Sequence, residues 1–155
     1  MKSVTLAVRE SLAILLNPLP HLTYLIPVYE EYVAGDPVEL ITVGNVEVQA
    51  YIVLKNQTQN DASAKCVRTD ETSIQAQITT VWPKNTGGSK LAEQIEESLM
   101  SVLFPISNIV PVMTLPEPFN LWQFRFIGSP NVSYRNETNS VWIKQPIFNM
   151  TVSQD

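Results

Sequence analysis

Residues 46–54 read VEVQAYIVL, and residues 73–82 read SIQAQITTVW. In both stretches nearly every second residue is apolar, and Trp82 closes the second one. A two-residue period puts successive side chains on opposite faces of a β-strand. The two stretches therefore predict a pair of half-buried strands, which we expect to pair antiparallel.

A polar segment, residues 56–72, separates these two strands. It contains neither Gly nor Pro, and its few apolar side chains cannot offset the entropy of ordering it alone. We therefore expect a long β-hairpin arm that is mobile in the isolated subunit. Cys66 lies in this arm near Arg68, and we interpret it as an incidental thiol rather than a reactive one.

Helical spacing of apolar residues appears twice. Residues 3–16 predict a first helix, with Ser3 as its N-cap and Asn17-Pro18 as its end. Ser89 is placed to cap a second helix, which Pro105 ends. The apolar stripe of the second helix consists of Leu91, Ile95, Leu99 and Val102.

Prolines mark the irregular parts of the chain. Residues 19–36 suit a brief extended piece, in which we expect His21 to be a loop residue. Residues 105–118 form an apolar, proline-rich connector that a lone monomer would not fully bury. Residues 141–152 predict a last long strand, with a break at Pro146.

Trp122, Phe124 and Phe126 alternate just before this last strand. With Arg125 among them, they could imitate a base-stacking sheet for single-stranded nucleic acid. Because the chain is acidic, we instead expect the three rings to share one face and to pack into the core.

The order of helix, two strands, helix and further strands has no helical crossovers between consecutive strands. It predicts an α+β fold: an antiparallel β-sheet of about four or more strands, with two α-helices packed on one face. The chain has 155 residues, of which 45% are apolar and 16% are charged. A single domain, residues 1–155, is expected.

The charge and residue counts exclude several classes of function. Ten basic and fifteen acidic residues give a net charge of −5, the wrong sign for neutralising phosphates, so DNA is not an expected tight ligand. One cysteine and one histidine exclude a disulfide framework within the chain and a Cys/His zinc site. Arg9 and Glu10 interrupt the apolar start of the chain before a signal-peptide core could form. No stretch approaches the ~20 uncharged apolar residues of a membrane span. We expect the chain to stay in the cytosol where it is made.

Carboxylates on the second helix are the main candidates for chemistry. Glu93, Glu96 and Glu97 cluster there and could serve acid–base or metal chemistry. Glu93 and Glu97 lie opposite the apolar stripe, which favours a solvated surface or a subunit contact. Asp61, Asp70 and Glu71 lack the spacing of a calcium loop, and residues 87–90, GGSK, lack that of a phosphate-binding loop. We expect no catalytic residue, no metal and no cofactor.

The order of four blocks resembles the bacteriophage tail terminator (tail completion) proteins, a family of head-to-tail connector ring proteins. The blocks are residues 50–54, 74–82, 90–103 and 124–148, and the likeness extends over residues 46–152 plus the N-terminal helix. The resemblance implies an antiparallel sheet with two helices on one face. It also implies a homo-oligomeric ring, usually a hexamer, that stops polymerisation at the head-proximal end of the tail tube.

For individual residues, the resemblance implies only subunit interfaces and no catalytic role. The candidates for subunit contacts are Glu93, Glu96, Glu97, Lys65, Arg68, Asp70, Val110, Val112 and Met113. The implied partners are further copies of the chain, the tail tube and portal or connector proteins, with no membrane. DNA would pass through the ring without specific binding, because like charges repel. The implied location is the head–tail interface of a virion.

Three alternatives stay open at this point. Residues 105–118 and residues 19–45 are longer than the resemblance implies, which leaves ring size open and admits a dodecameric collar or connector ring of a short-tailed phage. A metal-dependent enzyme would use the carboxylates of the second helix or of the arm. A small adaptor would instead add a strand to a partner at a sheet edge.

Overall fold

The computed structural model describes residues 3–31, 33, 40–63, 68–105 and 113–154. These residues form two helices and ten strands. Their order is α1 (Val4–Leu16), β1 (Leu19–His21), β2 (Tyr24–Ile26), β3 (Val28–Glu30), β4 (Leu40–Val43), β5 (Val46–Asp61), β6 (Arg68–Pro83), α2 (Lys90–Leu103), β7 (Phe119–Gly128), β8 (Asn131–Arg135), β9 (Asn139–Lys144) and β10 (Ile147–Gln154).

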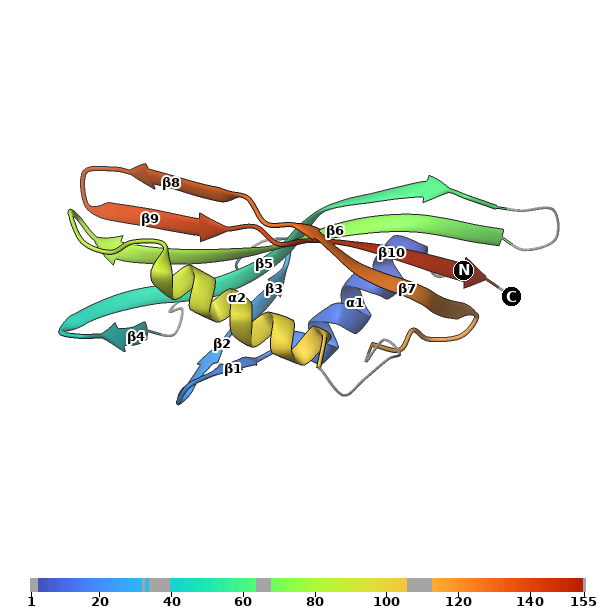
Figure 1. Cartoon of the computed structure of the whole chain (residues 1–155), viewed down its shortest axis with the longest axis horizontal. Coiled ribbons are helices and arrows are strands. Elements are labelled where there is room, and N and C mark those ends of the chain that lie inside the picture. The colour runs from blue at the N-terminus through green and yellow to red at the C-terminus, as the bar shows by residue number, and fades with distance from the viewer. Residues whose placement is uncertain (1–2, 32, 34–39, 64–67, 106–112, 155) are drawn as a thin grey trace.

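One eight-stranded sheet dominates the molecule, with the long β5–β6 hairpin at its centre (Figure 1). Strand β6 is long enough to pair with β10 over its first half and with β9 over its second half. Strand β7 extends the sheet beyond β10, and β8 extends it beyond β9. The sheet therefore has two wings, β10–β7 and β9–β8, which pair with successive halves of β6. The α+β fold class is confirmed.

The opposite edge of the sheet, along β5, carries two short strands. Strand β4 pairs antiparallel with β5, as consecutive strands do. Strand β3 pairs with β5 in parallel, so the sheet is mixed at this edge rather than wholly antiparallel. A separate two-stranded sheet, β1–β2, completes the described strands.

The alternation that predicted the two central strands is the pattern that buries them. The buried side chains of one face are those of Val48, Ala50, Ile52 and Leu54 on β5 and Ile74, Ala76, Ile78 and Trp82 on β6. They form one core cluster with the apolar stripes of both helices. Each large aliphatic side chain buried in this way contributes about 1.5–3 kcal/mol.

The polar arm forms the outer part of the central hairpin. Residues 56–61 continue β5, and residues 68–72 begin β6, paired down to Asp61 opposite Asp70. Mobility of the arm in the isolated subunit stays a prediction, and the predicted long β-hairpin is confirmed for these residues. The second half of β10 pairs with the other edge of β6 and supplies backbone partners that the hairpin alone lacks.

Helix α1 begins and ends where the sequence predicts. The Ser3 hydroxyl accepts a hydrogen bond from the Leu6 amide at 3.1 Å, which satisfies one free amide of the first turn. At the other end, Asn17 lies outside the helix and its Oδ1 accepts the Val28 amide at 3.1 Å. The same asparagine thus stops the helix and holds the first residue of β3.

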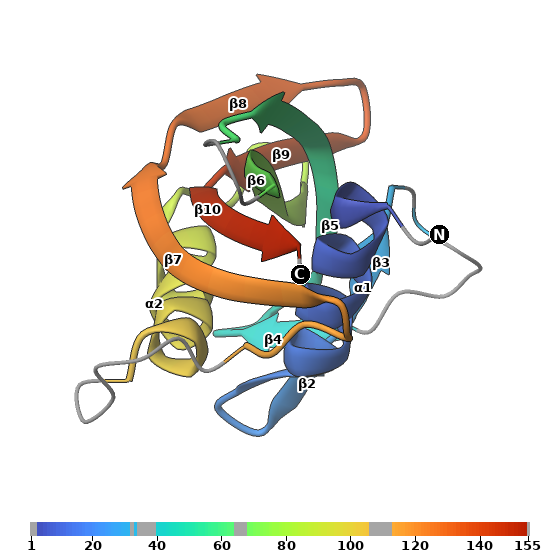
Figure 2. The ribbon, with the colours of Figure 1, turned by 90° about the vertical axis from the view of Figure 1, so that its right-hand side faces the viewer.

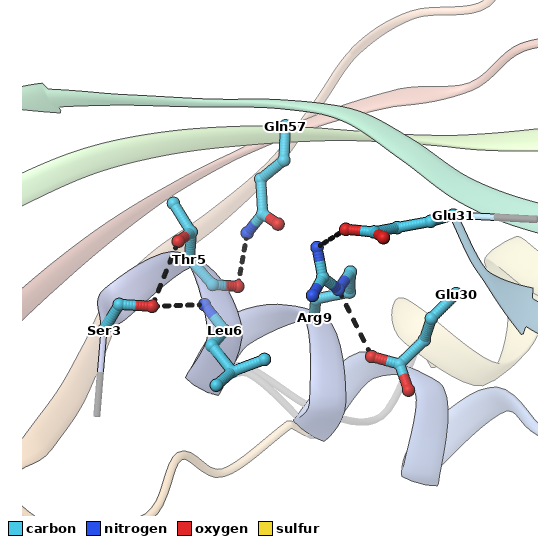
Figure 3. A network of polar contacts seen from close by, with 7 residues as sticks. All are labelled: Ser3, Thr5, Leu6, Arg9, Glu30, Glu31 and Gln57. Carbon is cyan, nitrogen blue, oxygen red and sulfur yellow. Dashed lines mark hydrogen bonds and ion pairs between the residues drawn. The ribbon is translucent and has the colours of Figure 1, made fainter.

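Polar contacts attach α1 to the sheet, as Figure 3 shows. Arg9 donates to Glu30 Oε1 at 3.3 Å and to Glu31 Oε1 at 2.6 Å. Gln57 Nε2, from β5, donates to the backbone oxygen of Thr5 at 2.6 Å. These contacts fix the first half of α1 against β3 and β5, below the hairpin in Figure 1.

Helix α2 crosses in front of β5 in Figure 1 and contacts β6 and β9. Ser89 stands at the predicted N-cap position, but its side chain makes no capping hydrogen bond. The turn before it depends on Gly87, which has a φ of +88°. A Cβ atom there would lie 2.4 Å from ring atoms of Trp82, so only glycine fits over the indole.

The predicted aromatic face of β7 is wrong in part. The register with β10 skips Trp122 and Ile127, so each is the extra residue of a β-bulge. Phe124 stacks on Phe148 at a centroid distance of 5.4 Å, and Phe126 approaches Phe148 at 6.1 Å. The bulge turns Trp122 away from these rings, and its side chain is 68% exposed. Figure 2 shows β7 curving beneath β10.

Two further expectations have different outcomes. The break at Pro146 is confirmed, because β9 ends at Lys144 and β10 begins at Ile147. The prediction that His21 is a loop residue is wrong, because His21 is the last residue of β1. It is buried, and its Nδ1 lies 2.9 Å from the Ser98 hydroxyl of α2, which explains how the β1–β2 hairpin is held under that helix.

Candidate interaction surfaces

The acidic face of α2 is where the sequence placed it. Glu93 and Glu97 are exposed, and Leu91, Ile95 and Leu99 on the opposite side of the helix are buried. Glu96 differs from its neighbours, because it is half-buried and accepts a hydrogen bond from the Ser129 hydroxyl at the β7–β8 turn. The exposed carboxylates of this face are therefore those of Glu93 and Glu97, which lie one helical turn apart.

Of the two arm candidates in the described residues, Arg68 and Asp70, one is exposed and the other is buried. Arg68 is exposed, and its Nε lies 3.6 Å from Oδ2 of Asp70. Asp70 itself is only 2% exposed, because it lies on the inner face of β6 opposite Val152. Arg68 is thus the accessible member of this ion pair in the single chain.

Of the remaining candidates, one in the arm and three in the connector, only Met113 lies in the described part of the chain. Lys65, Val110 and Val112 lie outside the described residues. Met113 is buried in the core cluster of the single chain. It lines a surface hollow, together with Leu115 and Trp122, where the chain enters β7.

Strand β7 exposes three large apolar side chains. The exposed fractions are 68% for Trp122, 59% for Ile127 and 42% for Phe126. Sequence reasoning missed this surface because it assumed uninterrupted alternation. Adjacent apolar pairs, Leu121-Trp122 and Phe126-Ile127, are the sequence signal, since strict alternation cannot bury both members of such a pair.

Two hollows lie beside the β8–β9 hairpin. One, of about 220 Å³, is lined by Ser133, Tyr134, Arg135, Ser140 and Trp142. The other, of about 180 Å³, shares Ser133 and Trp142 and extends to Ser89 and Ala92 at the beginning of α2. No sequence motif marks these hollows, because their walls come from strand pairing between residues that are distant or unremarkable in the sequence.

In the part of the chain that the structure describes, three titratable side chains have clearly shifted pKa values. Burial lowers the pKa of His21, since the charged imidazole loses hydration. Burial also raises the pKa of the Tyr51 phenol, against a smaller lowering by a hydrogen bond with Thr79. Hydrogen bonds from the side chain and backbone of Ser63 lower the pKa of Asp61. His21 lies on β1, whereas Tyr51 and Asp61 lie far apart along β5, so the three groups do not form a joint acid–base site.

Among the described residues, no three His, Cys, Asp or Glu side chains come together in a group that could hold a metal ion. Neither described helix has the length and apolar character needed to cross a bilayer.

Comparisons with known proteins give a likeness of fold. No protein-family model matches the sequence, and no curated protein matches it. A chain of the virion of a native gene transfer agent particle is similar in structure, with a TM-score of 0.53 and 16% sequence identity. The superposition covers 97% of this chain and 95% of that chain. At this identity the likeness concerns the fold alone.

Proposed function

We propose that the chain is a structural protein of a phage-like virion that forms a homo-oligomeric ring at the head–tail interface. In this position it would cap the tail tube, join it to the head connector, or do both. The observation that carries the proposal is the likeness, over nearly the whole of both chains, to a chain of a gene transfer agent virion. The tail terminator resemblance of the sequence supplies the finer assignment.

The surfaces of the chain support an assembly role. Trp122 and Ile127 expose large apolar side chains on β7, and such side chains are stabilised when a partner covers them. Strand β8 is exposed at all five residues, and among the described strands it pairs with β9 alone. The chemistry expected of an enzyme finds less support, since Glu93 and Glu97 face solvent on an open helix surface.

Purified particles provide the direct test. We expect mass spectrometry to detect the chain in them, and an electron cryomicroscopy map to contain its fold as a ring between head and tail. Light scattering after size exclusion should detect the ring in solution. Absence of the chain from purified particles would contradict the proposal.

The symmetry of the ring separates this assignment from its nearest alternative. Sixfold symmetry on a long tail tube is expected for a tail terminator, and twelvefold symmetry against the portal for a collar ring of a short-tailed phage. A turnover that disappears in Glu93→Gln or Glu97→Gln would instead favour the enzyme alternative.

A further inference from the structure

The turn of the β1–β2 hairpin contains a residue that does not suit its conformation. The loop between the two strands consists of Leu22 and Thr23, and Leu22 has a φ of +54°. Glycine is favoured where a two-residue hairpin loop begins with a positive φ, because a Cβ atom crowds the backbone in that conformation. A leucine adopts it only with conformational strain. The sequence thus places a bulky side chain where the turn alone favours glycine.

The same hairpin exposes apolar surface. Among the described residues, Leu22 is the most exposed large hydrophobic side chain, at 85%. Pro20 and Leu25, which pair beside the turn, are exposed as well. Residues 19–26 contain no Asp, Glu, Lys or Arg, and His21 among them is buried. A strained turn that presents an uncharged, apolar surface to water points to a partner that covers this surface.

The smaller hollow beside the β8–β9 hairpin has the complementary chemistry. Its volume is about 180 Å³, and since a cavity of about 150 Å³ in another protein holds benzene, a leucine side chain has room in it. The unpaired Oγ of Ser140 and Nε1 of Trp142 are both buried in the described part of the chain, so neither offers a donor at this surface. A charged side chain would lose hydration in the hollow without gaining a charged partner, so an apolar side chain is favoured. The lining residues are all uncharged: Ser89, Ala92, Asn131, Val132, Ser133, Trp142 and Ile143.

The turn and the hollow lie on opposite sides of the molecule. The β1–β2 hairpin projects at the bottom of both Figure 1 and Figure 2, whereas the β8–β9 hairpin lies at the top of both. Leu22 therefore does not reach the hollow of its own chain, but a second copy presents the same turn. A contact between two different surfaces of the same chain is heterologous, and its repetition closes a ring when the rotation between copies closes.

Among the exposed apolar side chains, Leu22 suits this hollow best. The apolar side chains exposed on β7 lie along a strand, not at a projecting tip. Ile14 on α1 is 82% exposed, but it lines a hollow together with Glu10 and Glu30. Docking of Ile14 would bring these carboxylates against uncharged walls, whereas the β1–β2 turn brings no charge with it.

We propose that Leu22, with Pro20 and Leu25 beside it, docks into the smaller hollow, between α2 and the β8–β9 hairpin, of a second copy of the chain. This inference rests on the proposed ring and names one contact within it. An uncharged centre is typical of protein–protein interfaces, whose cores are depleted of charged residues. The strain at Leu22 then has a function, since the turn presents a side chain that its own chain leaves exposed.

The first test separates assembly from stability. Leu22→Asn removes the apolar side chain and supplies a residue that tolerates a positive φ better. The urea midpoint, measured where light scattering finds a monomer, should stay the same or rise. The concentration at which half of the chain is assembled should rise about tenfold or more. Ile14→Gln, at a similarly exposed apolar position, is the matched control and should leave that concentration unchanged.

Two results of the first test would overturn the inference. Undiminished assembly of Leu22→Asn would show that the turn does not contact a second copy. A lower urea midpoint of the Leu22→Asn monomer would show that the leucine stabilises its own chain instead.

The second test changes the hollow. Val132→Lys puts a charge on its exposed wall and should raise the half-assembly concentration about tenfold. Tyr134→Lys, two residues further along the same strand and outside this hollow, is the control and should leave it unchanged. Equal effects of the two lysines would overturn the assignment to the hollow.

Cross-linking tests the pairing directly. Thr23→Cys and Asn131→Cys lie at exposed positions beside the turn and the hollow, and Cys66→Ser removes the natural thiol. With a short bismaleimide reagent, a chain that carries all three changes should give a ladder of covalent oligomers. Replacing Asn131→Cys by Gln123→Cys, at an exposed position of β7, should abolish the ladder. Because the reagent traps even a sparsely populated assembly, absence of the ladder from the first chain would overturn the contact.

Failure of this contact and failure of the proposed function can be distinguished. A ring between head and tail in which Leu22 lies away from the neighbouring hollow would overturn the contact and leave the proposed function intact. A chain that forms the ladder but is absent from purified particles would contradict the proposed function and leave the contact intact.

Discussion

The two halves of the β5–β6 hairpin have the same pairing geometry but different chemistry. In the apolar half, residues 46–55 and 75–83, alternate side chains enter the core beneath the sheet. In the polar half, residues 56–61 and 68–73, hydroxyl and amide groups replace them. Thr72 Oγ1 donates to the Thr58 backbone oxygen at 2.8 Å, and the hydroxyls of Thr58 and Ser73 lie 2.6 Å apart.

A register shift between Lys55 and Thr58 divides the halves, and Asn56 within it has a φ of +52°. Burial of apolar side chains thus stabilises the first half of the β5–β6 strand pair, and local polar contacts stabilise its continuation. A sheet can therefore extend beyond its hydrophobic core, provided that a third strand, here β10, supplies backbone partners.

The largest expected effect tests the apolar half. Ile78 is fully buried, so Ile78→Ala removes apolar contacts and leaves a cavity. We expect the free energy of unfolding to fall by about 3 kcal/mol, measured by urea denaturation. Gln59→Ala, at an exposed position of the polar half, should change it by less than about 0.5 kcal/mol. Equal losses at both positions would erase the distinction between the halves.

A smaller effect tests the polar half. Thr72→Val keeps the shape of a buried side chain but removes its hydrogen bond to Thr58. A loss of about 1 kcal/mol is expected, with hydrogen exchange accelerated at residues 58–61 before residues 48–54. Thr151→Val, on neighbouring β10 and without such a bond among the described contacts, is the matched control. Uniform acceleration along β5 would mean that the halves unfold as one unit.

The smallest effect at neutral pH comes from His21, which packs against α2 below the apolar half. Burial lowers its pKa, so the unfolded chain binds the proton first as the pH falls. Stability should be constant above about pH 7 and should decline as the pH passes below the unfolded value of about 6.5. His21→Phe should flatten this decline in urea midpoints measured from pH 7.5 to 5.5. A decline of the same slope in the variant would assign it to carboxylates.

The sequence predicted those parts of the fold that are determined by the chemistry of residues close together in the chain. The alternation ending at Trp82 marked the central strands, Asn17-Pro18 marked the end of α1, and Pro146 marked the break between the last strands. The polar half was predicted as a hairpin arm, but its pairing with β10 was not, because β10 lies about 80 residues away in the sequence. His21 was missed because its proline neighbours are typical of loops, whereas its burial comes from α2.

The candidate surfaces were predictable to a lesser extent. The helical period placed Glu93 and Glu97 on the exposed face of α2. Nothing local, however, marks Ser140 or Trp142 as unpaired, because pairing is a property of the folded neighbourhood.

The two bulges of β7 have a consequence for how this protein can change over time. In an uninterrupted strand, an insertion of one residue would turn every following side chain to the opposite face. The extra positions, Trp122 and Ile127, are instead absorbed locally, so Phe124 keeps its place against Phe148. Substitution at either position can therefore alter what the outside of the molecule recognises while the interior stays as it is.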